Sequence, residues 1–383
     1  MPVEYPRTVD DAWWRLRSLR HRPPDFAARG ERKDTFSAAL EQSEQFFRAA
    51  DSVGYESKPV MLYYGLSQAS QAILAAKQDP RVNKQTATGH GTDCPNRGQI
   101  TDVGDLEVCD ARTRTGAPPK GGAFQLLGGV LDSPTLPTGI PLRQLWISLP
   151  EGVELPPTKA GNLFGAVLLE RHDGHDYSKA FQATTGRVGK LAHLPYDLMP
   201  LDVAEVERQI IERYPALRNF RVMPNWQGCP DVAHWVLLLD PPGLRTSLSF
   251  DRGDRPMEHS EVFGMVELGR RVYGDGATKS IWRPPTLAGN TAPLHPLATW
   301  YAVLFGLSEL ARYQPTTWAR AININTSADA TALEHLMGTA HLACVNLIAE
   351  LFEIRHPPHD NQPEGWRQHN ERVHTWQRQQ QNT

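Results

Sequence analysis

The chain has 383 residues, a formal net charge of -3 and 40% hydrophobic residues, a composition typical of a globular protein with room for a sizeable core. This charge balance excludes a protein coated in positive charge, so any nucleic-acid site must be local. No apolar run reaches the roughly 20 residues that span a bilayer, and the N-terminus lacks an apolar signal core. Four cysteines without a CxxC spacing argue against a disulfide framework. We therefore expect a cytoplasmic protein with no membrane contact.

Residues 1–80 are predicted to form the N-terminal helical part of a bundle. An opening helix is expected at Val9–Leu19, and a second helix follows from the helical spacing of apolar and small residues across Phe36–Ala50. Asp34 or Thr35 is expected to cap this second helix. The third helix, Lys58–Leu74, is too apolar for a surface position and is therefore predicted to lie in the core.

Residues 81–290 are predicted to form a mixed or β-rich insertion. The segment Ala123–Leu131 indicates a strand or a close-packed turn, because glycines flank and interrupt it. Apolar residues with helical spacing at Val203–Tyr214 predict a helix within a region whose other segments favour strands. Strands are expected at Arg221–Met223 and Trp235–Leu239. The insertion should therefore hold a small mixed or antiparallel sheet.

Residues 291–355 are predicted to form the C-terminal helical part of the bundle, and residues 356–383 a flexible tail. The helix Leu294–Tyr313 is apolar on nearly all sides, which indicates burial. Large apolar side chains contribute roughly 1.5–3 kcal/mol each on leaving water, so the two apolar ends of the chain should pack together. The predicted fold class is α+β, a helical bundle formed from N- and C-terminal segments and interrupted by a β-containing insertion.

Several short motifs along the chain resemble the YaaC-like family of bacterial proteins. In chain order they are Lys58-Pro59 before Tyr63-Tyr64-Gly65, His90-Gly91, Gly122-Ala123-Phe124, and HPLATWYAVLFGLSELARYQPTTW at His295–Trp318. The resemblance extends from about Ala12 to Leu351 and is weaker in the middle. It implies a shared fold and carries no settled biochemical activity.

A looser resemblance concerns the helix Pro59–Ala76, whose tyrosine pair is similar to a core helix of HEPN domains. These are four-helix units of RNases, toxin–antitoxin pairs and phage-defence proteins. HEPN nucleases carry Arg-x4–6-His near the start of their last helix. The two Arg-x6-His pairs here, Arg252/His259 and Arg367/His374, lie in an expected loop and in the tail. The resemblance therefore implies a scaffold without the usual nuclease motif.

If the protein is an enzyme, the candidate catalytic residues are Arg312 with one of His295, His335 and His341. The arginine would stabilise the charge that develops on a scissile phosphate, and the histidine would act as general base. Arg312 has a structural interpretation as well. At a helix C-terminus it can bond the last carbonyls and stack on an aromatic ring.

The N-terminal arm is the best local candidate for a nucleic-acid surface, because cations and two adjacent tryptophans gather there. The alternative is a solvated arm whose tryptophans cover the helical core. Tyr63 and Tyr64 present the same choice between stacking on a base and filling the core. The predicted nucleic-acid-binding residues are Arg15, Arg17, Arg20, Arg22 and Lys33.

No metal or cofactor is expected. His90, Cys94 and Cys109 lack the second close pair of ligands that structural zinc prefers, and the HDGHD segment at 172–176 is typical of a turn. We expect a non-catalytic, HEPN-like interaction or regulatory subunit that binds nucleic acid or a protein partner, with stress or phage defence as its setting and homo-oligomers as an option. The alternative is a HEPN-type ribonuclease or another phosphodiester-cleaving enzyme.

Overall fold

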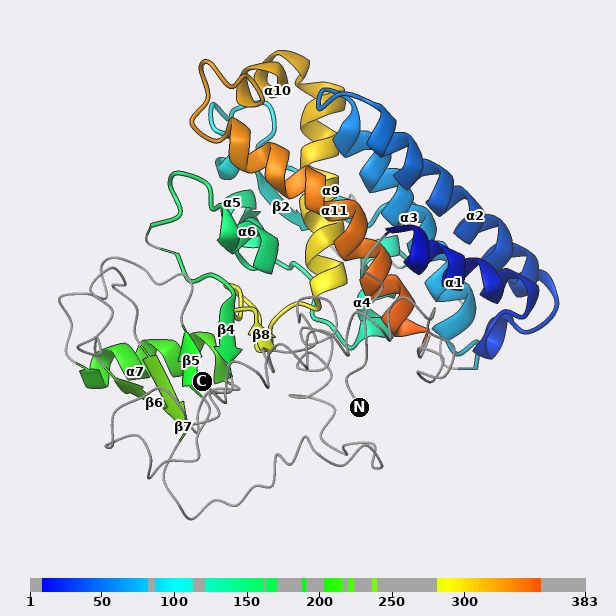
Figure 1. Ribbon diagram of the computed structural model, residues 1–383, viewed down its shortest axis with the longest axis horizontal. Coiled ribbons are helices and arrows are strands. Elements are labelled where there is room, and N and C mark those ends of the chain that lie inside the picture. The colour runs from blue at the N-terminus through cyan, green and yellow to red at the C-terminus, as the bar shows by residue number, and fades with distance from the viewer. Residues whose placement is uncertain are drawn as a thin grey trace, which may run out of the picture.

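The structure is a computed structural model of the whole chain, and the part that can be described is largely helical. The described residues are 9–81, 87–112, 121–161, 163–170, 188–190, 203–215, 220–223, 236–239 and 281–352. Long helices dominate both ends of this part, and short strands lie between them (Figure 1). The α+β expectation is confirmed at this coarse level.

Helices from the two ends of the chain lie against one another. From the N-terminal end come α1 (Val9–His21), α2 (Glu31–Ser52) and α3 (Lys58–Lys77); from the C-terminal end come α9 (Pro296–Tyr313), α10 (Pro315–Ala321) and α11 (Ala330–Leu351). Helix α2 packs along α3, while α3 contacts α9 and α1 contacts α11. In Figure 1 α3 lies beside α9, α2 lies on the other side of α3, and α11 crosses α9. Segments more than two hundred residues apart in sequence therefore share an interior.

Local sequence explains where several of these helices begin. Pro59, Pro296 and Pro315 each occupy the first turn of a helix, where the missing N–H leaves no bond unmade. The expected cap of α2 at Asp34 or Thr35 is wrong, because the helix already begins at Glu31. Gly30 precedes it with a φ of 70°, a conformation that favours glycine and turns the chain into the helix earlier than the polar cap signal indicated.

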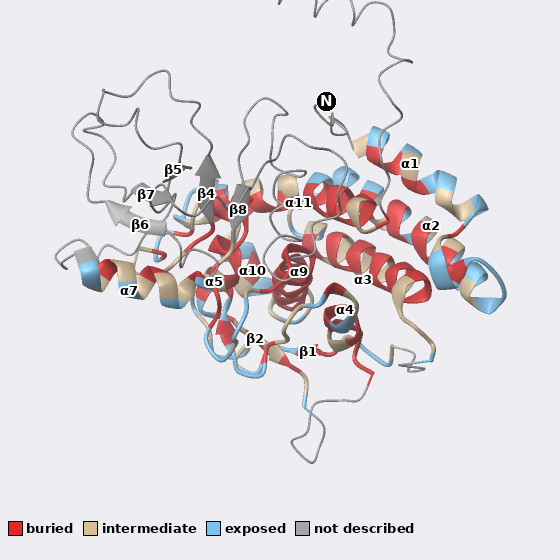
Figure 2. Cartoon of the chain, turned by 90° about the horizontal axis from the view of Figure 1, so that it is seen from below, coloured by how far each residue is buried: buried red, intermediate tan, exposed pale blue. Residues whose placement is uncertain are grey.

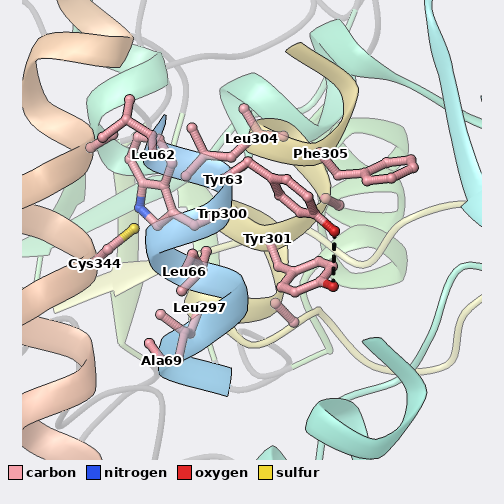
Figure 3. Close-up of a cluster of buried hydrophobic side chains, with 14 of the residues drawn as sticks. Leu62, Tyr63, Leu66, Ala69, Leu297, Trp300, Tyr301, Leu304, Phe305 and Cys344 are labelled. Atoms are coloured by element: carbon pink, nitrogen blue, oxygen red, sulfur yellow. Dashed lines mark hydrogen bonds between the residues drawn. The ribbon is translucent and has the colours of Figure 1, made fainter. Parts of the chain in front are cut away.

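Helix α9 is the centre of the described core. Every residue from Pro296 to Leu310 is buried, because α3, α4, α5, α10 and α11 all contact this helix. Figure 3 shows how Leu62 and Leu66 of α3 meet Trp300 and Leu304 of α9. An all-round apolar sequence requires such burial, so the prediction for this segment is confirmed.

The core also takes side chains from the segment between the two ends. Helix α4 (Ala123–Leu131) buries Phe124 and Leu127 in it, and α5 (Leu142–Ile147) buries Leu145 and Trp146. The expectation of a strand or turn at Ala123–Leu131 is wrong, because residues 123, 124, 127 and 131 fall on one helical face that packs on α3 and α9. The division of the chain into domains stays a prediction.

In the described ranges two small sheets accompany the helices, and all their strand pairs are antiparallel. The first has the order β1-β2-β3 and contacts α9; its strands are β1 (Thr92–Asp93), β2 (Glu107–Asp110) and β3 (Ile140–Pro141). The second has the order β6-β7-β5-β4-β8; its strands are β4 (Val167–Glu170), β5 (Val188–Lys190), β6 (Phe220–Met223), β7 (Val236–Leu239) and β8 (Ile281–Arg283). The antiparallel form of the sheet prediction is confirmed.

The five-stranded sheet carries its own helix, α7 (Val203–Arg213), which contacts β6. The helical stripe at Val203–Tyr214 and the strands predicted near 221–223 and 235–239 are confirmed. Figure 2 shows that α7 is far more exposed than α3 and α9. Within the described ranges, no helix is both long enough and apolar enough to cross a membrane.

Candidate functional site

Arg312 lies in the last turn of α9, where it bonds a backbone carbonyl and contacts aromatic rings. Its Nε donates to the carbonyl oxygen of Ser308 at 3.2 Å, and its Nη1 donates to the hydroxyl of Tyr64 at 3.3 Å. The guanidinium carbon lies 5.1 Å from the ring centre of Tyr313 and 5.8 Å from that of Tyr64. The side chain thus bonds the carbonyl of the residue four positions earlier in α9 and contacts two aromatic rings.

A buried carboxylate holds a second arginine beside the first. Glu309 Oε1 accepts from Arg312 Nη2 at 2.7 Å, and Oε2 accepts from Arg97 Nη1 at 2.8 Å. Burial raises the pKa of Glu309, although Arg312 and Arg97 act in the opposite direction. Since both oxygens accept charge-assisted hydrogen bonds, we regard the group as a carboxylate at neutral pH. One negative charge therefore orients two positive ones.

An exposed tyrosine completes this group. The Tyr313 side chain is 55% exposed, and the guanidinium carbons of Arg97 and Arg312 lie 5.2 and 5.1 Å from its ring centre. We call the set of Tyr64, Arg97, Glu309, Arg312 and Tyr313 the arginine–tyrosine cluster. Guanidinium N–H groups can bind a phosphate, and an exposed ring can stack on a base.

The tyrosine pair of α3 divides between the core and the cluster. Tyr63 is fully buried, and its hydroxyl lies 3.2 Å from that of Tyr301 (Figure 3). Tyr301 in turn donates to the carbonyl of His90 at 3.2 Å, and burial raises the pKa of Tyr301 to about 12. Tyr64 is partly exposed and bonds Arg312. The core interpretation therefore suits Tyr63, and the surface interpretation suits Tyr64.

His341 is tied into the helical core. Its Nε2 accepts from the indole N–H of Trp13 at 2.8 Å, and its Nδ1 lies 2.8 Å from a carboxylate oxygen of Asp51. The ring stacks on Phe47 with centroids 5.0 Å apart. Burial lowers the pKa of His341, with Asp51 acting in the opposite direction. Both ring nitrogens have partners in the fold, which favours a structural role.

His295 also has a structural task. It is buried at the N-terminus of α9, and its Nδ1 accepts from the backbone N–H of Leu297 at 3.1 Å. Burial lowers the pKa of His295 to about 4, so the ring is neutral at physiological pH. His335 lies on the partly exposed side of α11. The hydrogen bonds of His295 and His341 are thus made to groups other than Arg312, and the predicted pairing of arginine with histidine stays a prediction.

The cations of the predicted basic arm lie in different surroundings. Arg17 forms an ion pair with Glu44, and Arg20 forms one with Glu41, so part of its positive charge is neutralised by α2. Burial lowers the pKa of Arg15, while the charge of Asp11 acts in the opposite direction. The two remaining predicted residues, Arg22 and Lys33, are exposed. Of the adjacent tryptophans, Trp13 is buried and Trp14 is 69% exposed.

The sequence did not predict the contacts of two arginines, Arg32 and Arg97. Arg32 donates from Nε to the carbonyl of Ala75 and from Nη2 to those of Leu74 and Gln78, each at 2.7 Å, and so closes the end of α3. Arg97 was not singled out either, because its partner Glu309 is 212 positions away in sequence. The i, i+3 spacing of Glu309 and Arg312 is a signal that could have placed Glu309 beside Arg312.

The described residues offer little for metal chemistry. Cys94, Cys109 and Cys344 are free thiols, and burial raises the pKa of each. Across the ranges that the structure describes, no group of three histidine, cysteine or carboxylate side chains could hold a metal ion. The HDGHD segment and Cys229 lie outside those ranges.

Comparison with known proteins gives one family. The model of the family described as YaaC-like Protein matches residues 9–162 and 261–352. No curated protein and no solved structure matches the chain. The matched residues include α3, α9 and the arginine–tyrosine cluster.

Proposed function

The chain belongs to the YaaC-like family, and we propose that it is a non-catalytic binding protein whose ligand is nucleic acid. The observation that carries this proposal is the arginine–tyrosine cluster at the end of α9. There, two guanidiniums and an exposed phenol ring lie within reach of one ligand. Such a combination suits a single strand, in which unpaired bases can stack and phosphates are accessible.

Of the two arginines in the arginine–tyrosine cluster, Arg97 has the greater capacity to bind a ligand. Its side chain is 41% exposed, and among the described contacts its hydrogen bond to Glu309 uses Nη1 alone. Asp93 lies 3.8 Å away from the same nitrogen. Nε and Nη2 face no described acceptor, so the guanidinium can bind a phosphate with two parallel N–H groups while Glu309 holds its position.

The role of Arg312 in this proposal is to position the cluster. Its N–H groups already bond Ser308, Tyr64 and Glu309, and its side chain is less exposed than that of Arg97. It holds Glu309 and Tyr313 in place, and Glu309 in turn orients Arg97. The ligand would then contact Arg97 and Tyr313 directly.

The hydrogen bonds of two buried histidines support binding without turnover. The buried histidines His295 and His341 bond groups of the fold, and a general base needs a nitrogen that reaches the substrate.

We also propose the finer architecture, in which the helices of the two chain ends form one HEPN-like bundle. Its support is the shared core of α3 and α9. A setting in stress or phage defence stays a prediction.

The test is fluorescence anisotropy with labelled single-stranded RNA and single-stranded DNA. Tyr313→Ala should weaken binding roughly 5- to 150-fold, because one stacked base contributes ~1–3 kcal/mol. Arg97→Ala should reduce the slope of log affinity against log salt by about one, as expected for the loss of one phosphate contact. Arg208→Ala is the matched control, because Arg208 is an exposed arginine of α7 whose ion pairs are local.

Three results would contradict the proposal. The first is that the protein binds neither RNA nor DNA. The second is that Arg208→Ala weakens binding as much as Tyr313→Ala or Arg97→Ala does. The third is that the RNA is cleaved during the binding measurement. Cleavage that is abolished in Arg312→Ala or His335→Ala would favour the ribonuclease alternative. The double variant Arg22→Ala, Lys33→Ala tests the basic arm separately, since those two side chains are exposed.

A further inference from the structure

Helix α1 is joined to the rest of the core at one unusual point. It contacts α2 and α11, and Figure 1 shows it beside the lower part of α2. Its buried side chains are Ala12, Trp13 and Leu16. Trp13 makes the polar link, because its indole N–H donates to His341 Nε2 at 2.8 Å across 328 positions of sequence.

The bond from Trp13 fixes the proton of His341. An indole N–H can only donate, so Nε2 must present its lone pair, and the neutral ring then carries its proton on Nδ1. That proton points to Asp51 Oδ2, 2.8 Å away. The stacked ring of Phe47 prevents the imidazole from turning freely, because the two rings are 10° from parallel. One tautomer of the neutral ring therefore satisfies both neighbours.

We propose that α1 is a detachable segment, and that uptake of a proton by His341 releases it from α2 and α11. A second proton on the ring would sit on Nε2 and face the indole N–H, so that two donors oppose each other. The hydrogen bond becomes a repulsion, and the buried ring gains a charge. Separation of Trp13 from His341 relieves both effects and uncovers the apolar surface beneath α1.

The charged groups around His341 determine when this happens. Asp51 of α2 and Asp10 of α1 favour the protonated ring, whereas Arg48 of α2 and Lys58 of α3 oppose it. Burial is the largest influence and lowers the pKa of His341 below its usual 6.5. Release should therefore occur on acidification from neutral pH, and docking should be complete above ~6.5.

The carboxylates in two ion pairs of α1, Glu44 and Asp10, take up protons at lower pH than His341 does. Although burial acts to raise it, hydrogen bonds from Arg17 and Arg48 hold the pKa of Glu44 below its usual value. A hydrogen bond from Arg48 does the same for the pKa of Asp10. Both carboxylates thus stay ionised while His341 takes up its proton. A change between ~pH 7.5 and ~pH 5 that is lost in a variant without His341 therefore reports on this histidine.

Hydrogen exchange of α1, corrected for intrinsic rates, tests the proposal directly. In the wild type, protection of Val9–His21 should fall at least about tenfold between ~pH 7.5 and ~pH 5, while α9 keeps its protection. His341→Gln should abolish this dependence. The glutamine amide offers an oxygen to Trp13 and an N–H to Asp51, and it does not titrate.

Trp13→Phe is the second variant, and it keeps the result decisive if His341→Gln does not fold. It retains an aromatic ring in the core but removes the donor that a protonated histidine would face. Baseline protection of α1 should drop, and its pH dependence should become shallower. The proposal is overturned if wild-type protection is constant over this pH range, or if either variant retains the full wild-type dependence.

Discussion

Replacing Gly65 by alanine tests how closely α2 and α3 approach each other. A Cβ at this position would lie 2.8 Å from Phe47 Cδ2 and 3.0 Å from Cε2 and Cγ of the same ring. The backbone is equally tight, because Ser43 of α2 donates from Oγ to the carbonyl of Gly65 at 2.8 Å. The ring of Phe47 cannot move away easily, since it also packs on Trp13 and His341.

Two effects of opposite sign act in Gly65→Ala. Alanine stabilises a helix interior by ~0.5–1 kcal/mol relative to glycine. Overpacking of a filled core costs ~1–3 kcal/mol. Gly338 of α11 separates these effects, because a Cβ there meets no atom within 4 Å. The helix preference is common to both sites, so Gly65→Ala should be less stable than Gly338→Ala by ~1–3 kcal/mol.

Urea unfolding followed by circular dichroism measures this difference. Gly338→Ala should unfold at higher urea than the wild type, and Gly65→Ala at lower or equal urea. In a Phe47→Leu background the difference between the two alanine variants should shrink, because the clashing ring is gone. Equal stability of Gly65→Ala and Gly338→Ala in the wild-type background would refute the close contact of α2 and α3.

Three further outcomes are expected. Arg32→Ala should lower the free energy of unfolding by ~1–3 kcal/mol, because three carbonyls at the end of α3 lose a charged donor; urea midpoints check this against Arg29→Ala, an exposed neighbour. Burial holds the pKa of His295 at about 4, so the neutral ring stabilises the fold fully above pH ~6.5, and up to ~3 kcal/mol of the free energy of unfolding is lost as the pH falls towards ~4. His295→Asn keeps a cap that does not titrate and should flatten this part of the stability–pH curve. An unchanged curve would contradict the assignment. Cys344 should react with a thiol reagent far more slowly in the folded protein than in urea, because burial raises its pKa.

Helix positions with strong periodic patterns could be predicted from the sequence. Pro296–Tyr313 is apolar on nearly all sides, and this pattern leaves burial as the stable solution. The stripe at Val203–Tyr214 and the short apolar segments of β6 and β7 were also sufficient. In these segments local preference and tertiary packing favour the same structure.

Other features depend on partners far away in sequence and were not predictable. Ala123–Leu131 has glycines that suit a strand or turn, yet its packing on α3 and α9 selects a helix. The bond between Trp13 and His341 joins positions 328 residues apart, and no pattern within either helix announces it. For the candidate site, the sequence predicted Arg312 and the tyrosine pair, whereas Arg97 required the folded chain to bring it to Glu309.

The central position of α9 has a consequence for how the protein is made. Helices α2 and α3 are complete once Lys77 has been added, but the helix that covers them begins at Pro296. A ribosome adds ~5–20 residues per second, so the nascent chain carries this uncovered pair for roughly 10 to 40 s. During that interval the apolar side of α3 is open to chaperones and to other unfinished chains. Translation speed and chaperone supply should therefore influence the yield of this protein.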